Sequence, residues 1–184
     1  MTEIALHILD IANNSTRAEA SDVDVAIDAD SAKDTLTVTV ADDGKGMSEE
    51  LLSRVTDPFS TTRTTRRVGL GIPLFKQAAE LTGGSLKIRS GIGKGTTVTA
   101  VFGLSHIDRV PLGDVGATMA TLIGGAPGTD FTLTFSSDGK SYRFSTKEVK
   151  EMLDGVPIES MEVLGYIKEM IDENIENIIG GQPI

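Results

Sequence analysis

The sequence predicts an α/β fold of the α+β type, a two-layer sandwich in which helices cover one face of a mixed, mostly antiparallel sheet. Three observations predict it. Apolar residues recur at helical spacing over residues 2–19 and 70–81. Paired runs of alternating apolar and polar residues lie before and after the second of these segments. The pattern changes at residue 104, so we expect a first unit at 1–104 and a small C-terminal α+β module at 105–184.

The first helix and the first hairpin are indicated by simple periodicities. Ile4, Ile8 and Ile11 recur at the spacing of one helix face at the start of the chain. Two alternating runs follow at residues 23–27 and 35–40, and turn-forming residues separate them. The two runs therefore predict an antiparallel pair of strands.

The second part of this unit contains two helices that surround a polar loop. Ser48 can cap a short helix, which must end before Pro58. The polar stretch 60–68 predicts a loop, and the helix at 70–81 stops at Gly83-Gly84. Two further strands, expected at 85–90 and 96–102, complete the unit.

The C-terminal module is expected to hold a helix, a hairpin and two more helices. Asp138-Gly139 is a strong hairpin turn signal. The last helix carries a regular apolar stripe, which predicts a face that docks onto the rest of the protein rather than onto a membrane. The predicted segments are a helix at 115–123, strands at 131–135 and 141–144, and helices at 147–153 and 161–179.

The composition of the chain limits which kinds of partner it can bind and in which compartment it is expected. The 184 residues include 27 acidic and 17 basic side chains, and the net charge of -10 opposes binding to polyanionic nucleic acid. The sequence has no cysteine, which excludes disulfides and thiolate metal sites and permits a reducing compartment. Met1–Asp10 is amphipathic and acidic, so neither a signal peptide nor a membrane span is expected. We therefore expect a cytoplasmic protein.

Asp10 and Asn14 are the first candidates for chemistry. They lie four residues apart and so share one face of the first predicted helix. One of the two side chains could polarise a nucleophile while the other holds a metal ion. The alternative is an ordinary polar helix surface, because Asp and Asn are common there.

The segment Asp42–Met47 lies between a predicted strand and a helix. Gly44 and Gly46 allow the backbone to approach a flat ligand closely, and Asp42 could accept a hydrogen bond from an exocyclic amine. A plain strand-to-helix turn is the alternative. A calcium loop is disfavoured, because the acidic residues do not have the spacing of an EF-hand.

Gly69-Leu70-Gly71 opens a predicted helix, so its backbone amides could receive phosphate oxygens. Basic and hydroxyl side chains crowd the preceding loop, which suits a mobile cover over a polyphosphate, although a solvated basic loop is the alternative. Gly95-Thr96 alone indicates only a hairpin. The loop residues are Thr61, Thr62, Arg63, Thr64, Thr65, Arg66 and Arg67.

The order of these motifs is more specific than any one of them. The chain resembles the GHKL superfamily of ATP-binding proteins, which includes gyrase, heat-shock chaperone ATPases, histidine kinases and MutL. The resemblance covers residues 1–103, and Asp57–Phe102 is most similar to the catalytic domain of histidine kinases. The segment Asp10–Ser15 is similar instead to MutL-type ATPases and anti-sigma serine kinases.

The resemblance implies ATP and Mg²⁺ as cofactors and a role for each motif. Asn14 would coordinate Mg²⁺, Asp42 would bind the adenine amino group, and Thr96 would support Asp42. Arg17 matches a basic residue that faces phosphates. The other implied ligand-binding residues are Gly44, Gly46 and Met47 around adenine, and Thr61, Thr62, Arg63, Gly69, Leu70 and Gly71 around the phosphates.

Asp10 replaces the catalytic glutamate of the MutL-type and anti-sigma relatives and is one methylene shorter. We expect a regulatory protein kinase or anti-sigma-like factor that uses Asp10 as the base and transfers the γ-phosphate to a partner protein. The alternatives are a self-contained MutL-like ATPase, with a homodimer as one arrangement, and an ATP-sensing module without turnover. His7 and His106 are expected to be packing or surface residues.

Overall fold

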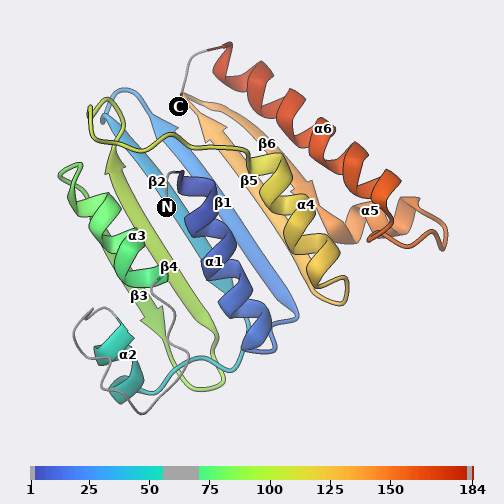
Figure 1. The fold of residues 1–184 in the computed structure, drawn as a ribbon, viewed down its shortest axis with the longest axis horizontal. Helices are drawn as coiled ribbons and strands as arrows, with labels where there is room; N and C mark the ends of the chain where they lie inside the picture. Colours follow the sequence, from blue (N-terminus) through green and yellow to red (C-terminus); the bar gives the residue numbers. More distant parts are fainter. Residues whose placement is uncertain (1–2, 56–70, 182–183) are drawn as a thin grey trace.

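The computed structural model describes residues 3–55, 71–181 and 184. Within them the strands form one six-stranded sheet in the order β3-β4-β2-β1-β5-β6 (Figure 1). The strands are β1 (Asp22–Asp30), β2 (Thr35–Asp42), β3 (Ser85–Ser90), β4 (Thr96–Gly103), β5 (Asp130–Ser137) and β6 (Lys140–Ser145). The helices are α1 (Ile4–Arg17), α2 (Glu49–Val55), α3 (Gly71–Glu80), α4 (Val115–Gly125), α5 (Thr146–Met152) and α6 (Met161–Ile179).

The sheet is mixed and mostly antiparallel, which confirms the predicted fold class. The pairings β1·β2, β2·β4, β3·β4 and β5·β6 are antiparallel, and β1·β5 is parallel. In β1 and β2 buried residues alternate with more exposed ones, as the sequence pattern predicts for strands with one buried face. The sheet therefore has one apolar face and one polar face.

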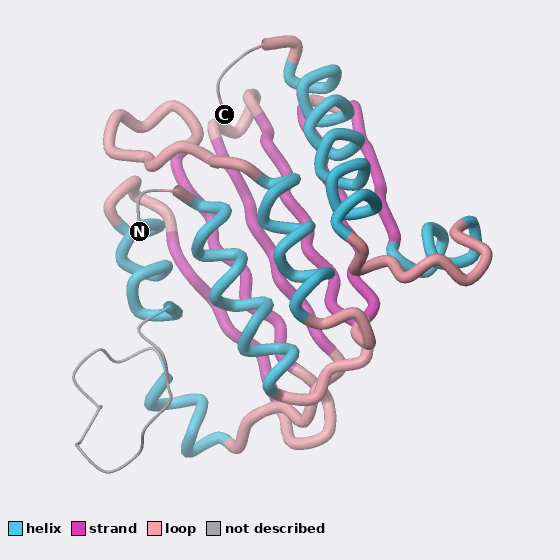
Figure 2. The backbone as a smooth tube through the Cα atoms, turned by 45° about the vertical axis from the view of Figure 1, so that its right-hand side comes forward, coloured by secondary structure: helices cyan, strands magenta, loops and turns pink. Residues whose placement is uncertain are grey.

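Helices α1, α3, α4 and α6 cover the apolar face (Figure 2). The core between the layers includes Ile8 of α1, Phe75 of α3 and Phe102 of β4, all of them buried. The opposite face carries threonines such as Thr39 and Thr99, whose hydroxyls lie 3.2 Å apart across β2 and β4. The structure is thus a two-layer sandwich.

The C-terminal hairpin extends the sheet of the first unit. Strand β5 pairs with β1 from Asp22↔Asp130 to Ala29↔Ser137. The predicted turn is present, since Asp138 and Gly139 both have positive φ, 46° and 86°. The two units share one sheet and one hydrophobic core. The division at residue 104 stays a prediction about domains.

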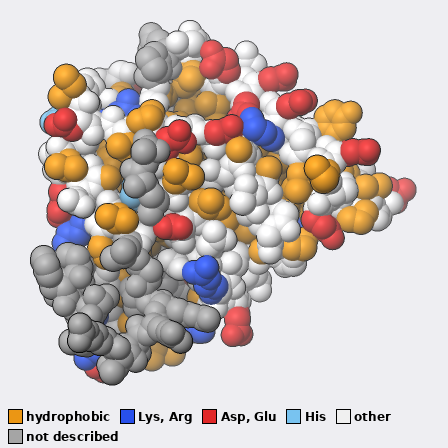
Figure 3. All heavy atoms as spheres, in the orientation of Figure 1, with side chains coloured by type: hydrophobic (Ala, Val, Ile, Leu, Met, Phe, Trp, Pro, Cys, Tyr) orange, Lys and Arg blue, Asp and Glu red, His pale blue; other side chains and the backbone are white. Residues whose placement is uncertain are grey.

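Helix α6 uses its apolar stripe to pack onto α4 and the adjoining strands. Ile167, Ile171 and Ile175 are buried, as expected for a docking face. Lys168 of α6 lies 3.2 Å from Asp114, which caps the N-terminus of α4. The surface around α6 is rich in acidic side chains (Figure 3). In the part of the chain that the structure describes, no helix has the length and apolarity needed to cross a membrane.

Candidate functional site

A cavity of about 470 Å³ lies between α1, α2, the start of α3 and the adjoining ends of β2 and β4. Its wall is mainly apolar, with a few polar groups, as is common in small-molecule sites. The apolar lining includes Ile11, Met47, Leu51, Val55, Ile72 and Val98. The polar lining includes Asn14, Ser15, Arg17, Asp42, Lys45 and Thr96.

Asp42 is held rigidly in this wall. Its Oδ1 accepts hydrogen bonds from the backbone N–H groups of Gly44 and Thr96, at 3.0 and 3.2 Å. Its Oδ2 accepts one from the hydroxyl of Ser15, at 2.6 Å. A carboxylate has about four acceptor positions, so Oδ2 keeps capacity for one more donor. Asp42 can therefore accept a hydrogen bond from a ligand in the cavity without rearrangement.

The neighbouring Asp43 points the other way and fixes the loop. Its Oδ1 accepts hydrogen bonds from the backbone N–H groups of Ser21 and Asp22, at 2.8 and 2.9 Å. The bond from Asp22, the main cause, and the bond from Ser21 hold the pKa of the Asp43 carboxyl below its usual value. The two adjacent carboxylates thus have different tasks, one facing the cavity and one binding the start of β1.

Glycine is required where the loop after β2 meets the β3–β4 turn. A Cβ atom on Gly46 would lie 1.9 Å from the carbonyl oxygen of Gly91. A Cβ atom on Gly95 would lie 1.8 Å from the carbonyl oxygen of Asp42. Both glycines have positive φ, 66° and 75°. The two backbones therefore interlock, and Asp42 sits at their contact.

Hydrogen bonds complete this junction. The backbone N–H of Met47 donates to Ser90 Oγ at 2.9 Å, and Gly93 N–H donates to the carbonyl of Lys45 at 2.8 Å. The hydroxyl of Thr96 lies 2.9 Å from Ser90 Oγ. Thr96 thus contacts Asp42 through its backbone amide, whereas its side chain bonds to Ser90. Met47 lines the cavity, and its role towards adenine stays a prediction.

Asp10 and Asn14 mark the other end of the cavity region. Asn14 and Arg17 line the cavity, and Arg17 Nη1 lies 3.4 Å from Asn14 Oδ1. Asp10 is exposed one turn earlier on α1. A Cβ atom on Gly71 would lie 3.1 Å from Asp10 Oδ2, so the start of α3 packs directly against Asp10. Asp10 is therefore not one of the described residues that line the cavity, and it lies beside the cavity instead.

Part of the expected phosphate site lies outside the described residues. These positions are Thr61, Thr62, Arg63, Gly69 and Leu70, together with Arg66 and Arg67 of the expected lid. Gly71 is the one residue of the Gly-Leu-Gly motif that the structure describes.

The sequence motifs predict no role for Ser15, Ala18 or Ser90 in the site. Ser15 donates to Asp42, and the carbonyl of Ala18 accepts a hydrogen bond from the backbone of Lys45 at 3.0 Å. Ser15 had a recognisable signal, because it follows Asn14 on the buried side of an amphipathic helix. Ser90 had none, since its contact depends on how the two loops meet.

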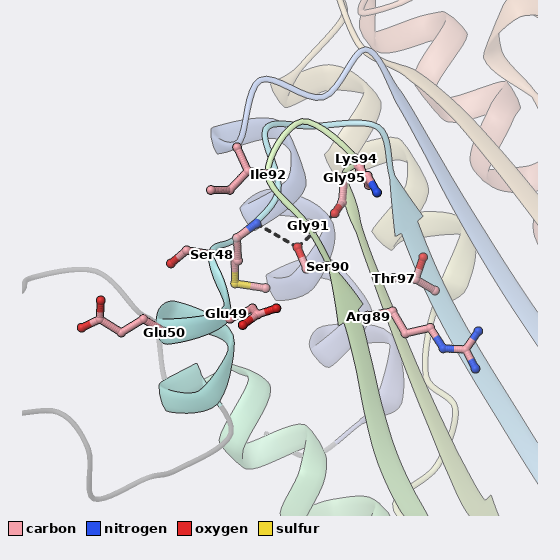
Figure 4. A pocket seen from close by; sticks show the side chains of 11 residues that line it. Ser48, Glu49, Glu50, Arg89, Ser90, Gly91, Ile92, Lys94, Gly95 and Thr97 are labelled. Carbon is pink, nitrogen blue, oxygen red and sulfur yellow. Dashed lines mark hydrogen bonds between the residues drawn. The ribbon is translucent and has the colours of Figure 1, made fainter.

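A second, larger hollow of about 930 Å³ adjoins the first (Figure 4). It lies between α2 and the β3–β4 turn, and Met47 lines both hollows. Its charged residues, among them Glu49, Arg89 and Lys94, are exposed. Because no buried polar group among the described residues converges on it, the smaller cavity, which contains the fixed carboxylate, is the better candidate for a binding site.

Among its described residues, the cavity offers too few metal-binding side chains to hold a metal ion unless a bound phosphate ligand also coordinates it. No group of three or more His, Cys, Asp or Glu residues lies close enough to hold a metal in the residues that the structure describes. Mg²⁺ commonly uses one or two protein oxygens together with phosphates and water. The amide oxygen of Asn14 fits such a role.

Comparison with known proteins shows which family the chain belongs to. The family model described as histidine kinase-, DNA gyrase B- and HSP90-like ATPase matches residues 2–106. Histidine protein kinase DivJ of Caulobacter vibrioides (strain ATCC 19089 / CIP 103742 / CB 15) is 32% identical over 96 residues, which are 50% of this chain. Sporulation kinase D of Bacillus subtilis (strain 168) is 30% identical over 98 residues, or 53% of the chain. The chain spans only 16% and 19% of the length of these relatives.

A solved structure supports the fold. The N-terminal domain of a DNA repair protein superposes with a TM-score of 0.52 over 78% of this chain and 52% of its own, at 14% identity. The fold and the family model together define a histidine kinase-like ATPase domain. The chain belongs to the histidine kinase-, DNA gyrase B- and HSP90-like ATPase family, which confirms the predicted GHKL resemblance.

Proposed function

We propose that this protein binds Mg-ATP in the smaller cavity and transfers the γ-phosphate to a partner protein. The observation that carries the proposal is the Asp42 carboxylate, which three donors from α1, β4 and its own loop hold at the cavity wall. The relatives named kinases support the second half of the proposal.

Asp42 would select adenine. Its free acceptor capacity matches the exocyclic amine of adenine, which donates a hydrogen bond. Guanine carries a carbonyl at the corresponding ring position, so it would present a hydrogen-bond acceptor, and not a donor, to the carboxylate. Met47, Ile72 and Val98 supply the apolar surface for the base. The interlocked Gly46 and Gly95 keep the carboxylate in place.

The phosphates would lie toward Asn14 and Arg17. The amide oxygen of Asn14 would hold a magnesium ion, which supplies positive charge to the phosphate oxygens. The guanidinium of Arg17 is exposed beside Asn14 and can turn to a phosphate, because the contact of 3.4 Å between them is long for a hydrogen bond.

Asp10 would act as the base. An acceptor hydroxyl or imidazole of the partner attacks the γ-phosphorus, and the bond to the β–γ bridging oxygen breaks. The electron pair leaves on ADP, and the Asp10 carboxylate takes the proton of the acceptor. Asp10 is exposed and adjoins Gly71, the first residue of α3, so a partner group can approach it. Its short side chain favours slow turnover.

Radiolabelled transfer tests this function. The protein is incubated with γ-labelled ATP, alone and in a native lysate. We expect slow release of phosphate by the pure protein and label on a second protein in the lysate. Acid-stable label would identify Ser or Thr as the acceptor, and acid-labile, base-stable label would identify His. Label only in free phosphate, with turnover that rises with protein concentration, would favour a dimerising ATPase, and neither transfer nor release would favour an ATP sensor.

A further inference from the structure

Large apolar side chains are exposed at the end of the molecule formed by α5, α6 and their connection. Met161 and Tyr166 expose 90% and 74% of their surface, and Met152, Val156 and Met170 are also exposed. Figure 3 shows hydrophobic side chains among acidic ones at this end. Adjacent exposed apolar side chains in a polar surround are typical of protein docking surfaces, and Tyr166 and Met170 are such a pair.

The packing of α6 onto the protein does not use this surface. Lys168 and Asp172 face α4, because Asp172 Oδ1 accepts a hydrogen bond from the backbone of Gly116 at 3.1 Å. Tyr166 and Met170 are four residues apart, so they are neighbours on the helix, and they lie on the side of α6 that points away from α4. Tyr166 and Met170 therefore form a small apolar patch on a side of α6 that the described residues leave uncovered.

The charge around this face has one sign. Residues 151–184 contain eight acidic residues and one lysine, so they carry seven of the ten net negative charges of the chain. The lysine, Lys168, lies 3.2 Å from Asp114 and 2.5 Å from Asp172. Glu169 and Glu173, beside Tyr166 and Met170, are exposed and make no ion pair within the described residues. Their charge is therefore available to a partner.

The exposed apolar residues and the surrounding negative charge together indicate what kind of partner could bind here. A second copy of the chain would bring acidic residues against acidic residues, and nucleic acid would be repelled in the same way. A segment that presents apolar side chains on one face and Lys or Arg on its flanks would cover the apolar residues and pair the carboxylates. We propose that the outer face of α6, centred on Tyr166 and Met170, docks a basic amphipathic helix of a partner protein.

The docking face is separate from the nucleotide cavity. The cavity lies against α1 and the ends of β2 and β4, whereas α6 packs on the same face of the sheet near its opposite edge, over β5 and β6 (Figure 1). The proposal goes beyond the proposed function, because docking on α6 requires neither nucleotide nor phosphoryl transfer. Binding at α6 should therefore be the same with and without ATP.

A designed peptide tests this proposal. The probe is a fluorescently labelled helical peptide of Leu and Lys with the leucines on one face, and its comparison is a scrambled peptide of the same composition. Fluorescence anisotropy should give at least ten-fold tighter binding for the amphipathic peptide. The variant Tyr166→Ala/Met170→Ala should lose at least ten-fold in affinity. The control Leu81→Ala/Ile107→Ala removes exposed apolar side chains elsewhere and should bind as the wild type does.

A second pair of double variants tests the contribution of the acidic residues to peptide binding. Glu169→Gln/Glu173→Gln should weaken binding several-fold and reduce its dependence on salt, whereas Glu19→Gln/Asp24→Asn makes the same change in net charge and should have little effect. Circular dichroism establishes that each variant is folded. Equal binding of the two peptides, equal loss in each variant and its control, or self-association of the wild type that Tyr166→Ala/Met170→Ala abolishes would overturn the proposal.

Discussion

The Asp42 end and the Asp10 end of the site are built differently. At the Asp42 end, three donors hold one carboxylate and two glycines interlock the loops around it. At the Asp10 end, Asp10 is exposed, and the Asn14 side chain has one long contact, with Arg17, among the described residues. Under the proposed function, recognition of the base would therefore be set before the ligand arrives, whereas the phosphate end would need the ligand to order it.

The largest expected effect separates chemistry from binding. Asp10→Asn keeps the shape of the side chain but removes the base, so turnover should fall roughly 100- to 10,000-fold. The affinity for ATP should stay within a few-fold, because Asp10 lies outside the wall of the cavity. Single-turnover kinetics and calorimetry measure the two quantities. Asp10→Glu is the control and should retain turnover, and a large loss of ATP affinity in Asp10→Asn would contradict the division between the two ends.

Gly46→Ala should damage the Asp42 end through the backbone. The added Cβ would meet the carbonyl of Gly91 at a positive φ, and we expect a loss of about 3 kcal/mol in the free energy of unfolding. Gly93→Ala is a matched control, since Gly93 also has a positive φ of 70° but has nothing within 4 Å of the added atom. Urea denaturation compares them. Equal losses would show that backbone strain, rather than the interlock, explains the requirement for glycine.

Acid should weaken the Asp10 end through His7. This histidine is buried on α1 and stacks on Phe75 of α3, with ring centroids 5.0 Å apart. Its Nδ1 has no hydrogen-bond partner in the part of the chain that the structure describes. Burial is the main cause that lowers its pKa from 6.5 to about 4, and the nearby Asp10 carboxylate acts in the opposite direction.

Between pH 6.5 and about 4, the unfolded chain therefore binds a proton at His7 that the folded chain does not. Stability from His7 is present above pH 6.5 and is lost as the pH falls towards about 4. Between about pH 7.5 and 5 the loss should be about 2 kcal/mol. His7→Phe should reduce this pH dependence, and the exposed His106→Gln should not. An unchanged pH dependence in His7→Phe would contradict this assignment.

The smallest effect concerns the support of Asp42. Ser15→Ala removes the donor at 2.6 Å, and the affinity for ATP should fall about five-fold, close to the 1 kcal/mol typical of one hydrogen bond. Thr16→Ala is the control, since its hydroxyl bonds to the carbonyl of Asn13 on the same helix. Calorimetry compares the two variants, and equal affinities would mean that Ser15 does not position Asp42.

The helices and strands were largely predictable because each has its own local signal. The alternation in β1 and the turn at Asp138-Gly139 are examples. The parallel pairing of β1 with β5 was not predictable, because it joins residues more than a hundred positions apart, such as Asp22 and Asp130. Long-range pairing depends on how whole layers pack rather than on a local pattern.

The candidate site was predictable as a set of motifs but not as a set of contacts. The position of Asp42 followed from the Asp-x-Gly-x-Gly pattern. Its partner Ser15 comes from a helix 27 positions away, and Thr96 supplies a backbone amide rather than its hydroxyl. Such contacts depend on the meeting of α1 and β4 in three dimensions.

Calorimetry with ATP and GTP tests whether Asp42 recognises the adenine amine, as the proposed function requires. The wild type should bind ATP in preference to GTP. Asp42→Asn should weaken ATP binding roughly ten- to a hundred-fold, because a hydrogen bond to a charged acceptor contributes about 1.5 to 3 kcal/mol. Equal affinity of the wild type for ATP and GTP, or an Asp42→Asn variant that binds ATP as tightly as the wild type, would contradict it.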